Sequence, residues 1–218
     1  MSARSRTIRE RVGLFGGTFD PPHIGHLALA EWARVELALD RVVFIPAGRP
    51  PHKRAERSSS ARLRWTLTRL ATRGHAAFEV SDVELRRRGP SYTADTVRVL
   101  AERWPGAALF LLMGADMFET FGDWVRPRDI LAHARLAVAL RPGVARPRAS
   151  RWSSVGHGVV WLRNPGLEVS SSALRRRART GQSVRYLVPE AVARAIESGD
   201  LYRGRPARRR RAPARRSA

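Results

Sequence analysis

Two glycines and two histidines near the start of the sequence have the types and spacing that suit phosphate chemistry. Gly16 and Gly17 carry no side chains, so the backbone there can come close to a phosphate group. His23 and His26 lie three residues apart, on one side of a first helical turn, where both imidazoles can face the same phosphate oxygens. Gly25 keeps the approach between them open. A helix start adds free N–H groups and the positive end of a dipole, so we expect residues 13–26 to bind a phosphorylated ligand.

Two simpler interpretations of residues 13–26 stay open at this point. The stretch could be a strand–helix turn with capping residues, or the histidine pair could ligate a metal, although no third ligand stands nearby. The stretch matches neither the dinucleotide pattern G-x-G-x-x-G nor the P-loop pattern G-x-x-x-x-G-K-[ST]. The sequence of 218 residues has no cysteine, which excludes disulfides, thiolate catalysis and cysteine-bound zinc.

A second stretch with similar chemistry lies at residues 169–175, VSSSALR. The serines at positions 170–172 are helix N-caps, and Arg175 sits one turn inside the helix, near enough to bind a phosphate held at its start. Taken alone, this stretch is equally a capped surface helix with a basic face.

The elements that position these residues can be read from hydrophobic periodicity and from turn residues. Continuous apolar runs predict strands, and helical spacing between them predicts helices, with Ser91 or Thr93 as the cap of the middle helix. This alternation indicates a single-domain α/β fold, a doubly wound, Rossmann-like parallel sheet with helices on both faces. Strands are predicted at 12–15, 41–47, 78–80, 107–113, 136–140 and 159–162, and helices at about 27–37, 61–73, 93–103, 172–179 and 189–197.

The predicted domain spans residues 12–203. Residues 1–11 form a basic extension, and residues 204–218 form an arginine-rich tail that cannot build a core and is expected to be disordered. Residues 47–60 and 141–157 are expected to be loops, and the sequence leaves open whether either closes as a lid. No run of 18 apolar residues and no signal-peptide core occurs, so we expect a cytoplasmic protein.

The formal net charge is +22, of which residues 1–11 contribute +3 and residues 204–218 contribute +7. A charge of this size is typical of proteins that bind nucleic acid. It also suits an enzyme that attracts a polyanionic small substrate such as a nucleoside triphosphate. Both interpretations remain at this stage.

The sequence resembles a known family in both stretches. GGTFDPPHIGH (16–26) is similar to the GGTFDPxHxGH signature of the HxGH nucleotidyltransferases, and VSSSALR is similar to their ISSTxIR signature, with Ser172 in place of the threonine. Further segments resemble the bacterial nicotinate-nucleotide adenylyltransferases, and the resemblance covers about residues 12–203. These segments are PSYTADT (90–96), GADMFETFGDW (114–124), RPG (141–143) and the ending at 186–203.

The resemblance implies a role for each matching residue. His23, His26 and Arg175 would be catalytic. Lys53 would contact substrate phosphate, Asp116 would contact ribose, and Thr93 backbone groups with the Trp124 ring would hold the nicotinate. The ATP-binding residues would be Gly16, Gly17, Thr18, Phe19, His23, Gly25, His26, Ser171, Ser172 and Arg175.

The implied reaction joins ATP and nicotinate mononucleotide to give nicotinate adenine dinucleotide and pyrophosphate. Mg²⁺ would be carried by ATP, and no dedicated protein metal site is expected. The resemblance implies neither a membrane nor a specific nucleic acid as a partner. It leaves open the oligomeric state and the preference for the acid over the amide mononucleotide. The alternatives are another HxGH adenylyl- or cytidylyltransferase, such as a phosphopantetheine adenylyltransferase, and a basic nucleic-acid-binding protein.

Overall fold

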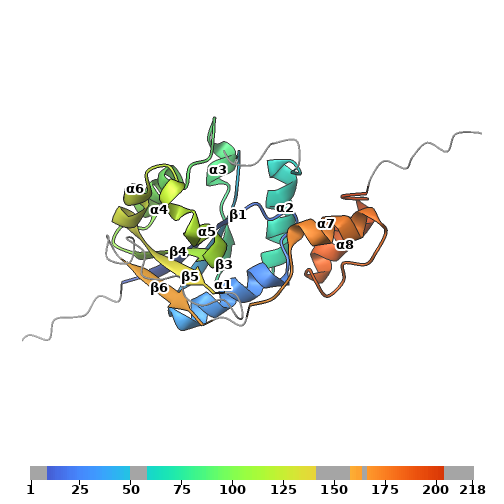
Figure 1. Ribbon diagram of the computed structural model, residues 1–218, viewed down its shortest axis with the longest axis horizontal. Coiled ribbons are helices and arrows are strands. Elements are labelled where there is room, and N and C mark those ends of the chain that lie inside the picture. Colours follow the sequence, from blue (N-terminus) through green and yellow to red (C-terminus); the bar gives the residue numbers. More distant parts are fainter. Residues whose placement is uncertain (1–8, 50–57, 141–157, 164–165, 204–218) are drawn as a thin grey trace, which may run out of the picture.

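One parallel sheet runs through the molecule in the strand order β3-β2-β1-β4-β5-β6 (Figure 1). The computed structural model describes residues 9–49, 58–140, 158–163 and 166–203. All adjacent strands pair in parallel, which confirms the predicted doubly wound sheet. The strands are β1 (Arg11–Gly17), β2 (Arg41–Pro46), β3 (Phe78–Val80), β4 (Ala108–Gly114), β5 (Ala134–Ala139) and β6 (Val159–Leu162).

The six predicted strands are therefore confirmed; β3 and β6 have the predicted ends, and the ends of the other four differ by at most two residues. Their continuous apolar sequences follow from burial on both faces of the sheet. Leu14 packs into one hydrophobic cluster and its neighbour Phe15 into another, on the opposite side. Leu111 and Leu112 divide in the same way.

The helices differ more from the prediction. The long ones occur where periodicity predicted them, whereas α3, α5, η2 and α6 were not predicted, because segments of three to seven residues hold too little periodicity to recognise. The helices are α1 (Ile24–Glu36), α2 (Ala61–Thr72), α3 (Val83–Arg86), α4 (Thr93–Arg103), α5 (Ala115–Glu119), η2 (Phe121–Asp123), α6 (Pro127–His133), α7 (Ser171–Arg179) and α8 (Glu190–Ser198).

The predicted cap of α4 was wrong. Tyr92 occupies the N-cap position and makes no side-chain cap bond. The Ser91 hydroxyl instead accepts a hydrogen bond of 3.0 Å from the Arg49 N–H, and the Ser91 N–H donates to the Arg49 carbonyl at 2.9 Å. The hydroxyl that local sequence assigned to the cap of α4 is therefore used in a long-range contact with Arg49.

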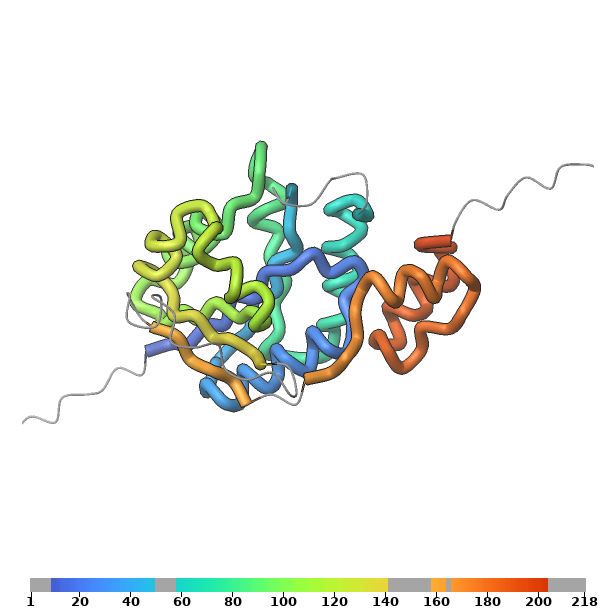
Figure 2. Tube along the Cα trace, in the orientation of Figure 1, coloured from blue at the N-terminus to red at the C-terminus, as the bar shows by residue number. Residues whose placement is uncertain are grey.

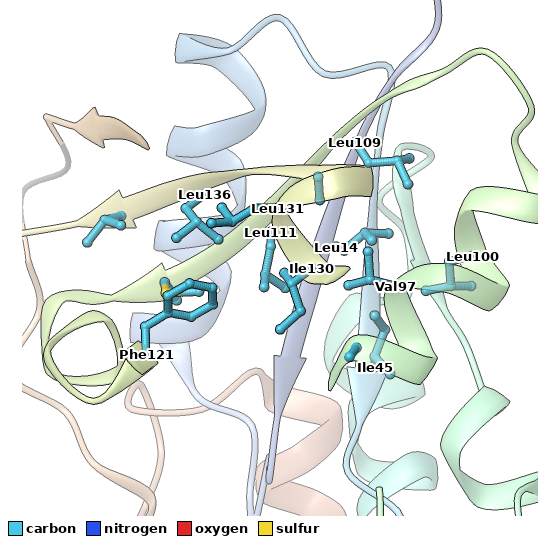
Figure 3. Close-up of a cluster of buried hydrophobic side chains, with 14 of the residues drawn as sticks. Leu14, Ile45, Val97, Leu100, Leu109, Leu111, Phe121, Ile130, Leu131 and Leu136 are labelled. Atoms are coloured by element: carbon cyan, nitrogen blue, oxygen red, sulfur yellow. The ribbon is translucent and has the colours of Figure 1, made fainter. Parts of the chain in front are cut away.

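Two helical layers cover the two faces of the sheet. On one face, α4, α5 and α6 pack on β1, β2, β4 and β5 around Leu111, Phe121 and Ile130 (Figure 3). On the other face, α1 packs its buried Ala30 and Ala33 against Phe44 and Leu112. Both cores are apolar, so the sheet holds its strand ends in fixed register.

A third hydrophobic cluster joins α2, α7 and α8 beside the sheet. Leu67 of α2 packs there with Leu174 of α7 and Val192 of α8. In Figure 2 the orange trace of α7 passes the blue trace between β1 and α1. The end of the described chain therefore lies against its beginning.

The order of the strands reverses between β1 and β4, which pair with each other while their chain neighbours lie on opposite sides. In open α/β sheets, ligands bind at the carboxyl ends of the strands at such a switch point. That edge carries the end of β1 at Gly17 and the end of β4 at Gly114. Within the described part of the chain, the helices are too short or too polar to cross a membrane.

Candidate functional site

The turn from β1 into α1 brings His23 and His26 together. His23 is the N-cap of α1 in extended conformation, and His26 is the third residue of the helix. Their rings stack with centroids 3.7 Å apart and planes inclined by 29°. The His23 backbone N–H donates to His26 Nδ1 at 3.2 Å. The predicted pairing of the two imidazoles on one side of the first turn is confirmed.

Burial decides the protonation of His23. His23 is only 6% exposed, and burial lowers its pKa to about 4, so its imidazole is neutral near pH 7. His26 accepts a hydrogen bond at Nδ1, which places the ring proton of the neutral form on Nε2. The neutral His23 ring therefore adds no charge to the turn near pH 7.

The glycines of the turn serve different purposes. A Cβ on Gly17 would lie 2.7 Å from the ring of Phe19, so Gly17 is needed for packing. Phe19 is itself buried at φ 48°, which leaves only its backbone near the ligand side. A Cβ on Gly25 would lie 3.1 Å from His23 Nδ1. At Gly16 a Cβ would meet nothing within 4 Å, so the approach to a ligand is open there.

The second motif docks directly onto this turn. Ser170 caps α7, its hydroxyl accepting from the Ala173 N–H at 3.2 Å. The Ser171 hydroxyl donates to the Pro21 carbonyl at 2.9 Å, and Arg175 Nη1 donates to the Asp20 carbonyl at 2.6 Å. The two stretches that sequence analysis selected therefore form one site.

Within α7, Ser172 supports Arg175. Arg175 Nη2 donates to the Ser172 hydroxyl at 3.3 Å. Arg175 stays partly exposed, so its guanidinium combines anchoring with an accessible positive charge beside the first turn of α1. The hydroxyl of Ser172, which stands where the family signature has a threonine, therefore helps to hold Arg175.

Asp20 is a member of the site that the sequence prediction missed. It is 1% exposed, its Oδ2 accepts from the Ser59 N–H at 3.0 Å, and its Oδ1 accepts from the Tyr202 hydroxyl at 2.8 Å. Arg175 Nη1 lies 3.9 Å from Oδ2. The position of Asp20 inside the GGTFDPP string was the available signal, but a carboxylate is usually exposed and none of these partners is near in sequence.

Arg64 of α2 is the second missed member. It is 2% exposed, and its guanidinium donates to the carbonyls of Thr18 at 3.0 Å, Ser59 at 3.0 Å and Gly48 at 3.3 Å. Burial lowers the pKa of Arg64, and the nearby Asp20 carboxylate opposes that shift. Arg64 thus fixes the backbone of three loops that surround the turn.

The residues implied for the second substrate lie at the ends of β4 and α4. Thr93 is the first residue of α4. Asp116 is exposed in the first turn of α5, and its carboxylate folds back so that a Cβ on Gly114 would lie 2.6 Å away. The Trp124 ring is half-buried and lies 5.5 Å from Phe121 between ring centroids.

An ion pair ties these elements to one another. Arg126 Nη2 lies 2.5 Å from Asp95 Oδ1, which joins the segment after Trp124 to the first turn of α4. Lys53 lies outside the described residues, and so do residues 141–157 and the tail at 204–218. The Arg126–Asp95 ion pair therefore links the segment after Trp124 to the helix that begins at Thr93, and Asp116 lies in α5, directly after β4, the strand next to β1.

No metal cage is apparent in this region. Among the described residues, no group of three or more His, Asp or Glu side chains could hold a metal ion. The donors that do converge are imidazoles, a guanidinium, serine hydroxyls and a helix start. This set binds anionic oxygen and suits phosphate better than a cation.

Comparison with known proteins agrees with this chemistry. Residues 14–177 match the family model described as cytidylyltransferase-like. A probable nicotinate-nucleotide adenylyltransferase of Geobacter sulfurreducens is 41% identical over 213 residues, covering 88% of this chain and 98% of that protein. A protein of the same description from Exiguobacterium sibiricum is 45% identical over 193 residues, with 88% and 98% covered.

Solved structures share the fold. A Plasmodium falciparum nicotinic acid mononucleotide adenylyltransferase complexed with NaAD has a TM-score of 0.73 at 13% identity, covering 89% of this chain and 98% of that one. A putative nicotinate-nucleotide adenylyltransferase of Vibrio parahaemolyticus has a TM-score of 0.65 at 17% identity, with 90% and 97% covered. At these identities the likeness concerns the fold alone.

Proposed function

The chain belongs to the cytidylyltransferase-like family and, within it, to the nicotinate-nucleotide adenylyltransferases, and we propose that the joined β1–α1 and α7 turns form its catalytic centre. The protein transfers the adenylyl group of ATP to nicotinate mononucleotide and releases pyrophosphate, a step of NAD biosynthesis. What remains to be assigned is which residues perform each part of the reaction.

The triphosphate of ATP binds at the start of α1. Gly16 leaves room for the phosphates, and ring N–H groups of His23 and His26 and the guanidinium of Arg175 donate to their oxygens. Ser171 and Ser172 hold Arg175 and the start of α7 in place. The backbone of Thr18 and Phe19 forms the floor of the turn.

The reaction is a single in-line displacement. A 5′-phosphate oxygen of nicotinate mononucleotide attacks the α-phosphorus of ATP, a new P–O–P bond forms, and the bond to the β-phosphate breaks with its electron pair leaving on pyrophosphate. The attacking phosphate is already an anion near neutral pH, so no general base is needed. His23, His26 and Arg175 stabilise the charge that accumulates on the transferring and leaving oxygens.

The second substrate lies along the ends of β4 and α4. Thr93 backbone groups and the Trp124 ring hold the nicotinate, because an aromatic plane suits a pyridinium ring. Asp116 accepts hydrogen bonds from ribose hydroxyls, and Lys53 contacts the phosphate from its loop. These assignments rest on the resemblance of residues 90–96 and 114–124 to the family.

Magnesium enters as part of the ATP–Mg²⁺ substrate. The described residues offer no cluster of acidic or imidazole ligands for a resident ion, so the residues present do not fit a protein-held metal site. No step of the proposed mechanism passes through a protein-bound metal.

The docking of Arg175 and Ser171 on the His23 turn carries this proposal, because it joins both family signatures in one site. The test is pyrophosphate release with ATP, Mg²⁺ and each of nicotinate mononucleotide, nicotinamide mononucleotide and phosphopantetheine. We expect strong preference for the first. Preference for phosphopantetheine would overturn the substrate, and no release with any of the three would overturn the catalytic centre.

The charge of +22 supports nucleic-acid binding as a second candidate function. Deletion of residues 204–218 separates the two functions. If nucleic-acid affinity resides in the tail, it should disappear with the deletion and fall steeply with salt in the full chain, while adenylyl transfer persists.

A further inference from the structure

Arg87, the residue after α3, holds a positive charge that no carboxylate of the described residues balances within 4 Å. Its neighbour Arg86 is paired with Asp82 at 2.7 Å. Arg87 Nη2 donates only to neutral oxygens, the Thr96 hydroxyl at 3.2 Å and the Tyr92 carbonyl at 3.4 Å. Its Nε and Nη1 are buried without a hydrogen-bond partner.

Comparison with Arg64 shows what is unusual about Arg87. The guanidinium of Arg64, which is 2% exposed, donates from Nε, Nη1 and Nη2 to three backbone carbonyls. Arg87 is partly exposed and donates from Nη2 alone. Its charge is therefore less fully engaged by the protein than that of Arg64, and it can attract an anion that a ligand brings near it.

The position of Arg87 indicates where the anion would arrive. Tyr92 is the N-cap of α4, and its carbonyl belongs to the same peptide unit as the Thr93 N–H. A hydrogen bond from a cation to that carbonyl polarises the peptide and strengthens its N–H as a donor. As the first helical residue, Thr93 has no intrahelical acceptor for this N–H. The helix dipole adds positive partial charge at the same place.

A buried network keeps Arg87 in this position. The Thr96 hydroxyl, which accepts from Arg87, donates to Glu84 Oε1 at 2.8 Å. Glu84 Oε2 accepts from the Gly48 N–H at 3.1 Å, and Glu84 is 9% exposed. The side chain of Glu84 is thus engaged by two other groups, and the guanidinium is held beneath the first turn of α4.

We propose that Arg87 is a specificity-determining residue that sets the preference for nicotinate mononucleotide over nicotinamide mononucleotide. The inference rests on the proposed function, in which Thr93 holds the pyridine ring. The nicotinate carboxylate is attracted by the positive charge of Arg87, and the neutral carboxamide is not. Because Nε and Nη1 are shielded from solvent, Arg87 acts through space and through the Tyr92–Thr93 peptide, without touching the substrate.

The test compares kcat/KM for the two mononucleotides in Arg87→Gln, Arg87→Lys and Arg86→Gln. In Arg87→Gln we expect the acid-to-amide ratio of kcat/KM to fall about tenfold or more, mainly through a higher KM for the acid, with the amide little changed. Arg87→Lys keeps the charge and should keep most of the ratio. Arg86→Gln, the matched control at the paired neighbour, should leave it unchanged.

An equal loss for both substrates, or an unchanged ratio, in Arg87→Gln would overturn the proposal, because either result describes a purely structural role. If thermal melting shows that Arg87→Gln does not fold, Thr96→Val replaces it. This variant removes the hydroxyl that holds Nη2, so the ratio should fall several-fold, and an unchanged ratio overturns the proposal. Absence of pyrophosphate release by the unaltered protein with either mononucleotide would reject the proposed function itself, and this inference with it.

Discussion

The ATP end and the nicotinate end of the candidate site are built differently. At the ATP end, Asp20 and His23 are almost fully buried, and Arg64 of α2, Arg175 of α7 and Tyr202 after α8 donate hydrogen bonds to the turn. At the nicotinate end, Asp116 is exposed in the five-residue helix α5, and Trp124 is half-buried directly after the three-residue helix η2. Charge stabilisation needs donors fixed in advance, whereas recognition of a ring tolerates adjustment. In the proposed mechanism, this difference separates the part that reacts from the part that selects.

The largest expected effect is at the ATP end. His26→Ala should lower kcat by about 10²-fold or more, because it removes one donor to the developing charge while the packing of α1 on the sheet remains. Single-turnover kinetics with ATP and nicotinate mononucleotide would measure the loss. His75→Ala is the control, since that ring stacks on Phe78 away from the turn. A folded His26→Ala protein with normal turnover would refute the catalytic role.

The same burial should make the ATP end sensitive to acid. The pKa of His23 is lowered from 6.5 to about 4 in the folded chain. Between pH 6.5 and pH 4, the unfolded chain therefore binds a proton on His23 that the folded chain does not bind. Stability should therefore fall as pH drops from 6.5 to 4, by up to about 3 kcal/mol from this group. Urea denaturation at pH 7, 6, 5 and 4.5 would measure it. His23→Gln should flatten that part of the pH dependence, and an equal slope in both proteins would contradict the assignment.

A smaller effect is expected at the nicotinate end. Trp124→Ala should weaken binding of nicotinate mononucleotide by about 1–3 kcal/mol, in the range of base–aromatic stacking, with little change in kcat. Isothermal titration would measure the affinity. Trp32→Ala, which removes a half-exposed indole on α1, is the matched control. Equal weakening of ATP binding by Trp124→Ala would show that the ring does not belong to the nicotinate end.

The smallest effect concerns the support of the ATP end. Tyr202→Phe removes the hydroxyl that donates to Asp20 and should cost about 1 kcal/mol of stability. Tyr186→Phe is the control, because Tyr186 is almost fully exposed. Thermal denaturation would compare the two variants. No difference between them would mean that Asp20 is held well enough by Ser59 and Arg175 alone.

The sheet and the two motifs could be predicted because their signals are local. Each buried strand is an apolar run between turn residues, and residues 13–26 and 169–175 keep their chemistry within a few positions. The parallel order followed from alternation with helices. That both motifs meet at one turn is a tertiary fact, and the sequence grouped them only through the resemblance, which assigns both to ATP binding.

The supporting residues could not be predicted because their signals are distant. Asp20, Arg64 and Arg87 are charged, and charged side chains are expected on the surface unless a partner is known. The hydroxyl of Ser91 was assigned to a helix cap, yet it is used by Arg49, which lies 42 residues away. A short window of sequence does not include partners that lie so far apart. The residues of the candidate site are therefore easier to find from sequence than the residues that support them.

The Asp20–Tyr202 hydrogen bond closes a loop of 182 residues, and the Asp20–Arg175 and Pro21–Ser171 contacts close loops of 155 and 150. On the ribosome, β1 and the histidine turn emerge long before their partners do. The sheet can begin to form during synthesis, but the catalytic turn stays unsupported until residue 202 has left the exit tunnel. A growing chain is thus an incomplete enzyme until residue 202 has been added, and a chain that stops after α7 would carry both signatures and an unfinished site.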